Sequence, residues 1–283
     1  MKLNHILVIG AGVMGRGIAL TTARAGYSTT LFDVNAEMLE VSEQYANGFL
    51  SKSVEKGKLS PEDRQATLDR LTFSQSENNW EADLVIEAVP ERLPLKHQVL
   101  QQAADLNSRE TILASNTSTL PITRIAAPIP HPERVVGLHF FNPAPLMKLV
   151  EVIAGAATSP ETLETVTKLA QNLGKQPVQA RDVPGFIVNR VARHFYLESL
   201  KTLETGGIDH EGIDRLLRSS GFRMGPFELM DLIGVETNHS VTQSMYEAFF
   251  YDEKFRPSLI QQQKADAGHH GRKTGKGFYT YPD

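Results

Sequence analysis

The stretch Ile6-Leu7-Val8-Ile9-Gly10-Ala11-Gly12-Val13-Met14-Gly15 decides the fold. Four apolar residues with strand-like composition run into three glycines spaced G-x-G-x-x-G, and a helical pattern follows over residues 14–25. In this spacing the first glycine permits a tight turn, the second lets a pyrophosphate approach the backbone, and the third allows close helix–strand packing. The stretch therefore predicts the opening strand–turn–helix of a dinucleotide-binding domain.

A carboxylate further along the chain indicates which dinucleotide is bound. Asp33 lies 18 residues after Gly15, at the end of a β-branched segment over 29–32. An acidic residue at this place accepts hydrogen bonds from ribose hydroxyls, and its charge repels a 2′-phosphate. The two residues after Asp33 are not basic. We therefore expect NAD rather than NADP. The alternative to a cofactor site is a plain glycine-rich turn with a solvated aspartate. The predicted cofactor contacts of this unit are Gly10, Gly12, Val13, Met14, Gly15 and Asp33.

Strand-like and helix-like segments alternate up to about residue 180. Alternation of this kind is typical of parallel strands joined by helical crossovers. We therefore expect an α/β fold with a doubly wound, mostly parallel, Rossmann-type sheet. The predicted strands cover 6–9, 29–32, 84–88, 112–115, 135–141 and 149–154, and the predicted helices cover 14–25, 35–56, a segment starting at 61, and 160–174.

The pattern changes after residue 184. Helical periods replace strand signals until about residue 268, with clear helices predicted at 227–233 and 235–250. The sequence thus predicts two domains. Residues 1–182 form the NAD-binding domain, and residues 183–283 form a smaller, all-helical domain.

The composition excludes several classes of protein. With 41% hydrophobic and 22% charged residues, the chain has the mixture typical of a globular protein. A net charge of −4 argues against a nucleic-acid binder, and the absence of cysteine excludes disulfides and thiolate–zinc sites. No stretch without charged residues exceeds 13 residues, whereas a membrane span needs about 20 apolar ones. Since residues 1–4 run straight into an apolar segment without a leader-like pattern, we expect a cytoplasmic location.

A histidine and a glutamate on neighbouring apolar segments are the strongest catalytic candidates. Segments 135–141 and 149–154 flank a turn that contains Asn142-Pro143 and Pro145. If the segments pair antiparallel about Pro145, positions that sum to 290 face each other. His139 then lies opposite Glu151, with Cβ atoms about 4.5–5.5 Å apart.

This pairing suits acid–base chemistry. A carboxylate among apolar neighbours is costly without a partner, and an imidazole resolves that cost. The carboxylate in turn orients the ring and raises its basicity. A core ion pair without chemistry is the alternative, but hydride transfer to or from an alcohol needs a proton acceptor. The remaining histidines lack the spaced partners of a metal site, so no metal is expected.

Two further polar groups accompany the pair. The stretch Ser115-Asn116-Thr117-Ser118-Thr119 follows an apolar strand, on the side where doubly wound sheets bind ligands. Asn189 is a polar residue at an otherwise apolar helix start, where it could face a cleft between the two domains. A plain surface loop and a plain surface asparagine are the alternatives.

These residues resemble the L-3-hydroxyacyl-CoA dehydrogenase family, and the resemblance covers nearly the whole chain. The histidine segment and the segment 184–190 are its specific parts, whereas the glycine motif is shared with many dehydrogenases. The matching segments are the glycine motif, 85–91, 115–118, 137–153, 184–190, 225–231 and 271–279.

The resemblance implies roles for individual residues. His139 is expected to be the catalytic acid–base and Glu151 its orienting partner. Ser118 is expected to hydrogen-bond the 3-oxygen of the substrate, and Asn189 to hold the reacting end of the acyl-CoA. The positions that match NAD contacts are Asp33, Glu91, Lys96 and Asn116.

Substrate contacts are also expected outside the reacting end. Ser51 and Lys58 match family positions near the CoA moiety, where a lysine suits an anionic phosphate. Asn142, in the turn after His139, is a further predicted substrate contact. By the same resemblance, the helical domain is expected to close over the substrate and to form a homodimer.

The resulting expectation is an NAD-dependent oxidoreductase that interconverts (S)-3-hydroxybutyryl-CoA, or another short-chain 3-hydroxyacyl-CoA, and acetoacetyl-CoA or its homologue. His139 would take the hydroxyl proton in oxidation and return it in reduction. One alternative is a dehydrogenase of a non-CoA hydroxy or sugar acid on the same scaffold. The other is an NAD-binding structural protein without turnover.

Overall fold

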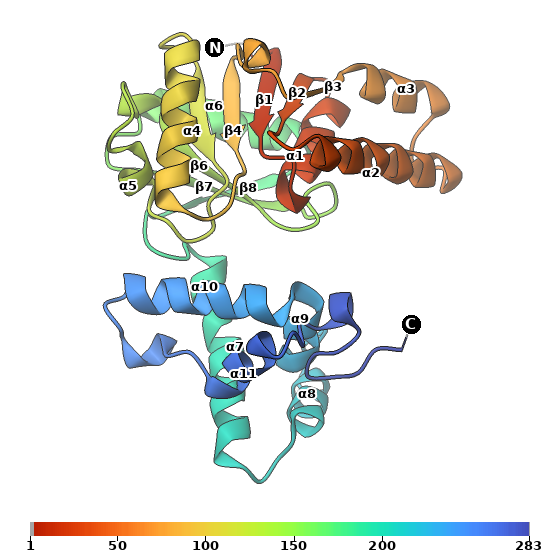
Figure 1. The fold of residues 1–283 in the computed structure, drawn as a ribbon, viewed down its shortest axis with the longest axis vertical. Helices are drawn as coiled ribbons and strands as arrows, with labels where there is room; N and C mark the ends of the chain where they lie inside the picture. Colours follow the sequence, from red (N-terminus) through yellow and green to blue (C-terminus); the bar gives the residue numbers. More distant parts are fainter. Residues whose placement is uncertain (1–2, 283) are drawn as a thin grey trace. The chain divides into compact units, whose positions relative to one another are not determined.

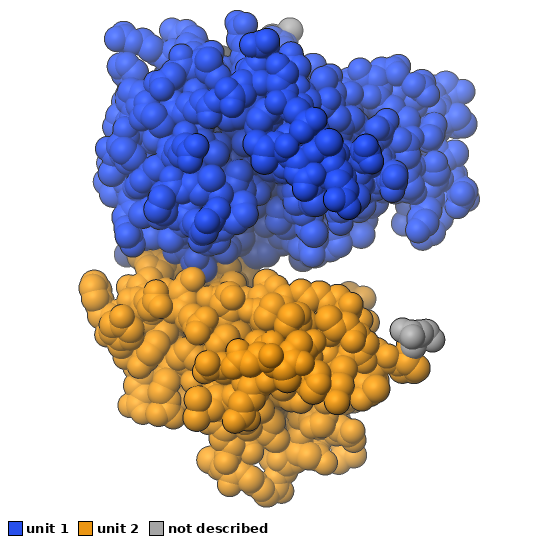
Figure 2. Space-filling view, in the orientation of Figure 1, with its two compact units in different colours: residues 1–182 blue, residues 183–283 orange. Residues whose placement is uncertain are grey.

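The computed structural model describes residues 3–282, which fall into two compact units. Unit 1 comprises residues 1–182 and unit 2 comprises residues 183–283 (Figure 2). Each unit has its own hydrophobic core.

Unit 1 is built on an eight-stranded sheet with the order β3-β2-β1-β4-β5-β6-β7-β8 (Figure 1). All neighbouring strands pair in parallel except β6 and β7, which are antiparallel. The predicted doubly wound, mostly parallel sheet is therefore confirmed. The strands are β1 (His5–Ile9), β2 (Ser28–Phe32), β3 (Leu71–Ser74), β4 (Leu84–Glu87), β5 (Ile112–Ser115), β6 (Val135–Phe140), β7 (Leu149–Ala154) and β8 (Gln176–Ala180).

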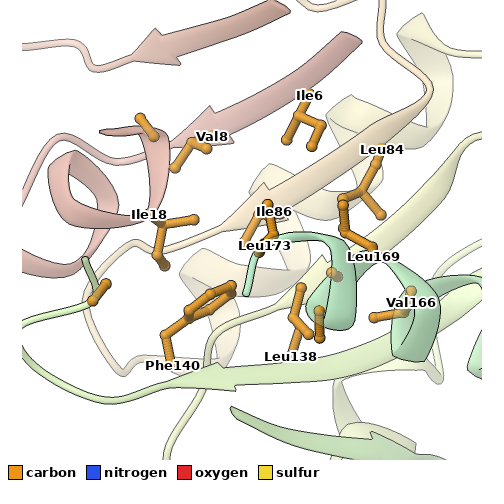
Figure 3. Packing of buried hydrophobic residues seen from close by; sticks show 14 of the residues in the cluster. Ile6, Val8, Ile18, Leu84, Ile86, Leu138, Phe140, Val166, Leu169 and Leu173 are labelled. Atoms are coloured by element: carbon orange, nitrogen blue, oxygen red, sulfur yellow. The ribbon is translucent and has the colours of Figure 1, made fainter. Parts of the chain in front are cut away.

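Helices cover both faces of this sheet. The face that carries Ile6, Val8 and Ile86 packs against Ile18 of α1 and Val166 of α6 (Figure 3). Helices α4 and α5 contact β4, β5 and β6 on the other face. The central strands are thus buried on both sides, which is why they read as continuous apolar runs. The helices of unit 1 are α1 (Val13–Arg24), α2 (Ala36–Glu55), α3 (Pro61–Asp69), α4 (Leu93–Leu106), α5 (Ile122–Ala126) and α6 (Pro160–Asn172), with 3₁₀ turns η1 (Glu77–Asn79) and η2 (Pro132–Arg134).

Two strands escaped the sequence pattern, and both lie at the edges of the sheet. β3 has an alternating half-buried pattern, and β8 is mostly exposed and contains Pro177. Proline is tolerated at a sheet edge because an edge strand has fewer backbone donors to satisfy. Helices α4 and α5 were also not predicted: α4 starts at Leu93-Pro94 without a side-chain cap, and α5 has only five residues. The strands and helices of unit 1 that were predicted end within about two residues of the observed positions.

Unit 2 is a helical unit whose core includes Tyr196, Leu200, Phe227 and Phe278. Among its described residues, the β-structure consists of two isolated bridges near the C-terminus, Gly271 to Lys276 and Lys276 to Thr280. Its elements are α7 (Val188–Thr205), α8 (His210–Ser219), α9 (Pro226–Ile233), α10 (Val235–Ala248), η3 (Glu253–Phe255), α11 (Leu259–Asp266) and η4 (Arg272–Thr274). Within residues 3–282 of the whole chain, every helix is too short or too polar to cross a membrane.

Candidate active site

His139 and Glu151 face each other across the antiparallel pair β6–β7. This register is the predicted one, so that expectation is confirmed. His139 Nδ1 lies 2.7 Å from Glu151 Oε2, and the two residues are only 6% and 1% exposed. Since the carboxylate engages Nδ1, the opposite ring nitrogen, Nε2, is the one placed to exchange a proton with a ligand.

The backbone after His139 is held in place from two sides. The buried ammonium of Lys175 donates hydrogen bonds to the carbonyl oxygens of Ala144 and Met147, the second at 2.8 Å. Burial lowers the pKa of Lys175, and the neighbouring Arg24 lowers it further. Helix α1 packs against the same loop at Gly17, where a Cβ would lie 3.2 Å from that of Ala144. The loop that follows the histidine therefore rests on the helix that begins at the glycine motif.

The glycine motif has the shape that a pyrophosphate requires. Gly10 has φ +104°, and a Cβ there would lie 2.8 Å from the carbonyl oxygen of Ala88. A Cβ on Gly15 would lie 1.7 Å from the Gly10 carbonyl oxygen. At Gly12, by contrast, a Cβ would meet nothing within 4 Å. Gly12 thus faces open space at the start of α1, where backbone N–H groups and the helix dipole favour an anion. The residues present fit a dinucleotide.

Asp33 connects this loop to the end of β2. Its Oδ2 accepts a hydrogen bond from the Ala11 N–H at 2.7 Å, and its Oδ1 accepts one from the Asn35 N–H at 2.9 Å. Each carboxylate oxygen can accept a second hydrogen bond. Asp33 can therefore brace the glycine loop and still accept from a ribose hydroxyl. The bracing function escaped the sequence reasoning.

A buried ionic cluster lies where β4 ends. Lys96 Nζ, on α4, lies 2.7 Å from Glu87 Oε1 and 3.1 Å from Glu91 Oε2. Lys96 and Glu87 are 1% and 0% exposed, whereas the Glu91 side chain is 32% exposed. Burial alone would raise the pKa of Glu91, but the charge of Lys96 and hydrogen bonds from Thr117 and Thr119 lower it overall. Glu91 is therefore ionised at neutral pH.

Glu87 was missed in the sequence analysis. It ends the otherwise apolar strand β4, and a carboxylate at the end of a buried parallel strand was the available signal. Its Oε2 accepts a hydrogen bond from Ser115 Oγ at 2.6 Å, at the end of the neighbouring strand β5.

The polar loop after β5 contains the predicted substrate residue Ser118. Thr117 Oγ1, Ser118 N and Thr119 N donate to Glu91 Oε1 at 2.6, 3.0 and 3.0 Å. Asn116 Oδ1 accepts a hydrogen bond from the Phe140 N–H at 2.9 Å, one residue after His139. The loop is thus connected to the glutamate cluster and to the histidine strand.

The other predicted residues are spread over both units. Val13 and Met14 form the first turn of α1, with Val13 54% exposed. Asn142 is exposed in the loop between β6 and β7, Ser51 is half-buried on α2, and Lys58 is exposed just beyond that helix. Asn189 lies in the first turn of α7, in unit 2. Unit 1 therefore carries the histidine pair, the glycine loop and the polar loop, and unit 2 carries Asn189.

The described residues include no group of three or more histidine or carboxylate side chains arranged to hold a metal ion.

The chain was compared with families and proteins already characterised. Residues 5–183 match the NAD-binding domain of 3-hydroxyacyl-CoA dehydrogenase, and residues 185–281 match the C-terminal domain of the same enzyme. The chain is 46% identical over 283 residues to 3-hydroxyadipyl-CoA dehydrogenase of Escherichia coli K12, covering 99% of this chain and 60% of that relative. It is 40% identical over 285 residues to a probable 3-hydroxybutyryl-CoA dehydrogenase of Bacillus subtilis, covering 100% and 99%.

A solved structure agrees along the full length. The crystal structure of (S)-3-hydroxybutyryl-CoA dehydrogenase from Ralstonia eutropha is similar with a TM-score of 0.94 and 35% identity, covering 100% of both chains. The similarity therefore extends over both units of the chain.

Proposed function

This chain belongs to the 3-hydroxyacyl-CoA dehydrogenase family, and from that premise we propose that it interconverts (S)-3-hydroxybutyryl-CoA and acetoacetyl-CoA with NAD. The observation that carries the proposal is the buried contact of 2.7 Å between His139 Nδ1 and Glu151 Oε2. This contact lies in the unit that matches the NAD-binding domain, beside the loop that packs on α1. A braced imidazole in the same unit as a dinucleotide-binding loop provides what the oxidation of an alcohol requires: a proton acceptor and a place for the hydride acceptor.

The residues of the chain have separate tasks in this reaction. NAD, when bound along Gly10, Gly12, Gly15 and Asp33, supplies the hydride acceptor. His139 Nε2 accepts the proton of the 3-hydroxyl group in oxidation and returns it to the 3-oxygen in reduction. Glu151 holds the ring in the tautomer with Nδ1–H and stabilises the imidazolium.

Hydrogen-bond donors complete the site around the oxygen. We assign Ser118 and Asn189 to the 3-oxygen and its neighbourhood, where each donor contributes on the order of 3 kcal/mol to transition-state stabilisation in other enzymes. Asn142 is assigned to the acyl group. Ser51 and Lys58 are assigned to the CoA moiety, because the Lys58 ammonium is exposed and suits a phosphate.

The two named relatives differ in the acyl group of the substrate that their names give. The Escherichia coli relative is named for a dicarboxylic acyl group, and the Bacillus subtilis relative for a four-carbon one. We assign the four-carbon substrate because the relative that matches along its whole length carries that name.

A substrate panel tests this assignment. NADH or NADPH absorbance is followed for the reduction of acetoacetyl-CoA and 3-oxoadipyl-CoA by NADH or NADPH, and for the oxidation of free sugar acids by NAD or NADP. We expect the highest kcat/KM with acetoacetyl-CoA and NADH. Turnover only of sugar acids would support the non-CoA dehydrogenase, and NADH binding without any turnover would support a structural protein.

We also propose a homodimer that forms through unit 2. An apolar groove of about 620 Å³ lies between α7 and the segment 222–229, and Val191 and Phe222 in it are 67% and 49% exposed. Exposed apolar surface of this kind is typical of a protein–protein interface.

A cytoplasmic location remains a prediction from the sequence, and cell fractionation would test it.

A further inference from the structure

The buried lysine Lys175 has no part in the reaction described above. It is 8% exposed, and its Nζ donates hydrogen bonds to the carbonyl oxygens of Ala144 and Met147 at 2.5 and 2.8 Å. Burial lowers the pKa of Lys175, and a second cation, Arg24 on α1, lowers it further. A buried ammonium beside another cation is costly for a fold, because carbonyl groups replace its lost hydration but do not neutralise its charge. The lysine therefore invites an explanation other than stability.

The end of helix α6 fixes the backbone of Lys175. Gly174 has φ +71°, and its N–H donates to the Gln171 carbonyl oxygen at 2.9 Å. The Lys175 N–H donates to the Ala170 carbonyl oxygen at 3.0 Å. These two hydrogen bonds form a Schellman motif, which ends a helix at a defined residue. The long side chain of Lys175 thus extends from a fixed point of the backbone, directly before β8.

The ammonium binds the loop that joins β6 to β7, residues 141–148. Within this loop, the N–H groups of Leu146 and Met147 both donate to the Pro143 carbonyl oxygen at 3.0 Å. Lys175 adds hydrogen bonds to two further carbonyl oxygens of the loop. The loop is therefore held at three of its carbonyl oxygens, two of them by one side chain from another element.

Helix α1 contacts the same loop. A Cβ on Gly17 would lie 3.2 Å from the Ala144 Cβ and 3.3 Å from the Pro145 Cδ. A methyl group at Gly17 would therefore fit only if the loop moved, because close-packed interiors leave no spare volume. Gly17 lies two residues after Gly15, the last glycine of the dinucleotide motif. One loop thus contacts both the buried ammonium and the helix that starts at the glycine loop.

We propose that Lys175 is a positioning residue, which holds the 141–148 loop against α1 so that His139 keeps a fixed separation from the glycine loop. This inference rests on the proposed function for the roles of His139 and the glycine loop. The 141–148 loop begins two residues after His139, so a shift of the loop is passed to the imidazole through the backbone. A displacement of about 1 Å in a reacting group costs on the order of 100-fold in rate.

The first test removes the ammonium. Methionine resembles lysine in length and has no hydrogen-bond donor. Since Lys175→Met takes a charge out of the interior, the variant is expected to fold. The matched control is Lys168→Met on α6, at a lysine whose side chain is 66% exposed. For both variants and the parent, the measurements are the single-turnover rate of acetoacetyl-CoA reduction, the dissociation constant of NADH and the number of NADH sites per chain.

The expected result separates positioning from a loss of folded protein. In Lys175→Met, the rate per NADH site falls about 100-fold, while the NADH dissociation constant stays within about threefold. The control variant matches the parent. A purely structural lysine would instead lower the number of NADH sites and leave the rate per site unchanged, and that result would overturn the proposal.

A double-mutant cycle tests the loop contact without any substrate. Gly17→Ala is made in the parent and in Lys175→Met, and urea unfolding is followed by the fluorescence of Trp80, the single tryptophan, which is buried in unit 1. The gain in helix propensity from alanine is the same in both backgrounds and cancels in the cycle. Because the lysine keeps the loop from moving aside, the methyl group should lower the urea midpoint by about 0.2 M or more beyond its effect in Lys175→Met.

The cycle also separates the two proposals. An equal effect of Gly17→Ala in the two backgrounds would show that Lys175 does not hold the loop against α1, and the proposal would be wrong. If the parent reduces no acyl-CoA, the proposed function fails, and the cycle still decides whether the lysine holds the loop.

Gly17→Ala alone covers the case in which Lys175→Met does not fold. It displaces the same loop while the lysine stays in place. We expect the rate per NADH site to fall about tenfold, with the NADH dissociation constant within about threefold of the parent. A rate per site equal to that of the parent would count against the proposal.

Discussion

At the scale of single residues, the chemistry depends on carboxylates that hold other groups. Glu151 holds the imidazole of His139, and Asp33 holds the Ala11 N–H of the glycine loop. Glu91 accepts hydrogen bonds from three successive residues of the polar loop. In each case the carboxylate fixes a group of the candidate site. Replacing the carboxylate by its amide removes the charge and nearly keeps the shape of the side chain.

Glu151→Gln tests the charge behind the histidine. The amide still accepts a hydrogen bond from Nδ1–H, but the imidazolium loses its counter-charge. We expect kcat to fall about 100-fold or more. A pH–rate profile and a plateau rate equal to those of the parent would argue against the pair.

Asp33→Asn tests cofactor selectivity. The amide oxygen keeps one acceptor for the Ala11 N–H, whereas the charge that repels a 2′-phosphate is lost. The preference for NADH over NADPH, measured as a ratio of dissociation constants, should narrow about tenfold or more. The amide nitrogen replaces the acceptor of the Asn35 N–H, so one hydrogen bond is lost and the melting temperature should fall by roughly 2–4 °C. An unchanged ratio would remove Asp33 from this role.

At the scale of elements, two glycines of the glycine loop serve different purposes. One leaves room for a ligand, and the other lets the chain pack closely against itself. Gly12 and Gly15 lie three residues apart, but only Gly15 is crowded by the chain itself. The sequence motif predicted that both positions need glycine, and it predicted a different physical reason for each position. It could not show that Asp33 also braces the loop, because that contact depends on how the end of β2 meets β1.

Matched alanine variants test this division. Gly12→Ala should change the free energy of unfolding by less than about 0.5 kcal/mol, since its Cβ meets nothing within 4 Å. It should weaken NADH binding at least about tenfold, because the methyl group occupies the cofactor's place. Gly15→Ala should cost on the order of 3 kcal/mol, because its Cβ would lie 1.7 Å from the Gly10 carbonyl oxygen. Urea unfolding and NADH titration measure the two effects. Equal stability losses in the two variants would contradict the division.

Elements that are buried could be predicted from the sequence more readily than elements that are exposed. Central strands such as β1 and β5 are buried on both faces and gave clear apolar runs. The edge strands β3 and β8 did not, because solvent removes the need for apolar residues there. The facing pair His139–Glu151 could be predicted because an antiparallel turn fixes the register. The cluster of Glu87, Lys96 and Ser115 could not, since it joins three elements whose packing is set by tertiary structure.

At the scale of the whole molecule, each unit matches one domain of the family. Residues 5–183 match the NAD-binding domain, and residues 185–281 match the C-terminal domain. The division of the chain into the units 1–182 and 183–283 falls at the same place. The α/β class and the NAD-binding nature of the first unit could be derived from residues, whereas the acyl-CoA substrate came from the resemblance to the family.

The homodimer is tested by a charge in the apolar groove of unit 2. Val191→Glu places a carboxylate on a side chain that is 67% exposed in the groove. Burying an unpaired charge in an interface is costly, so we expect a monomer by sedimentation velocity where the parent is a dimer. Leu259→Glu, at a leucine that is 71% exposed outside the groove, is the control and should remain dimeric. A dimeric Val191→Glu variant would move the interface elsewhere.

The most direct measurement compares His139→Gln with the parent in a single-turnover reduction of acetoacetyl-CoA by NADH. Glutamine keeps a polar side chain of similar reach but cannot shuttle a proton at neutral pH. We expect the rate to fall about 10²–10⁴-fold, while the NADH dissociation constant stays near that of the parent. A rate within a few-fold of the parent would contradict the assignment of His139 as the acid–base.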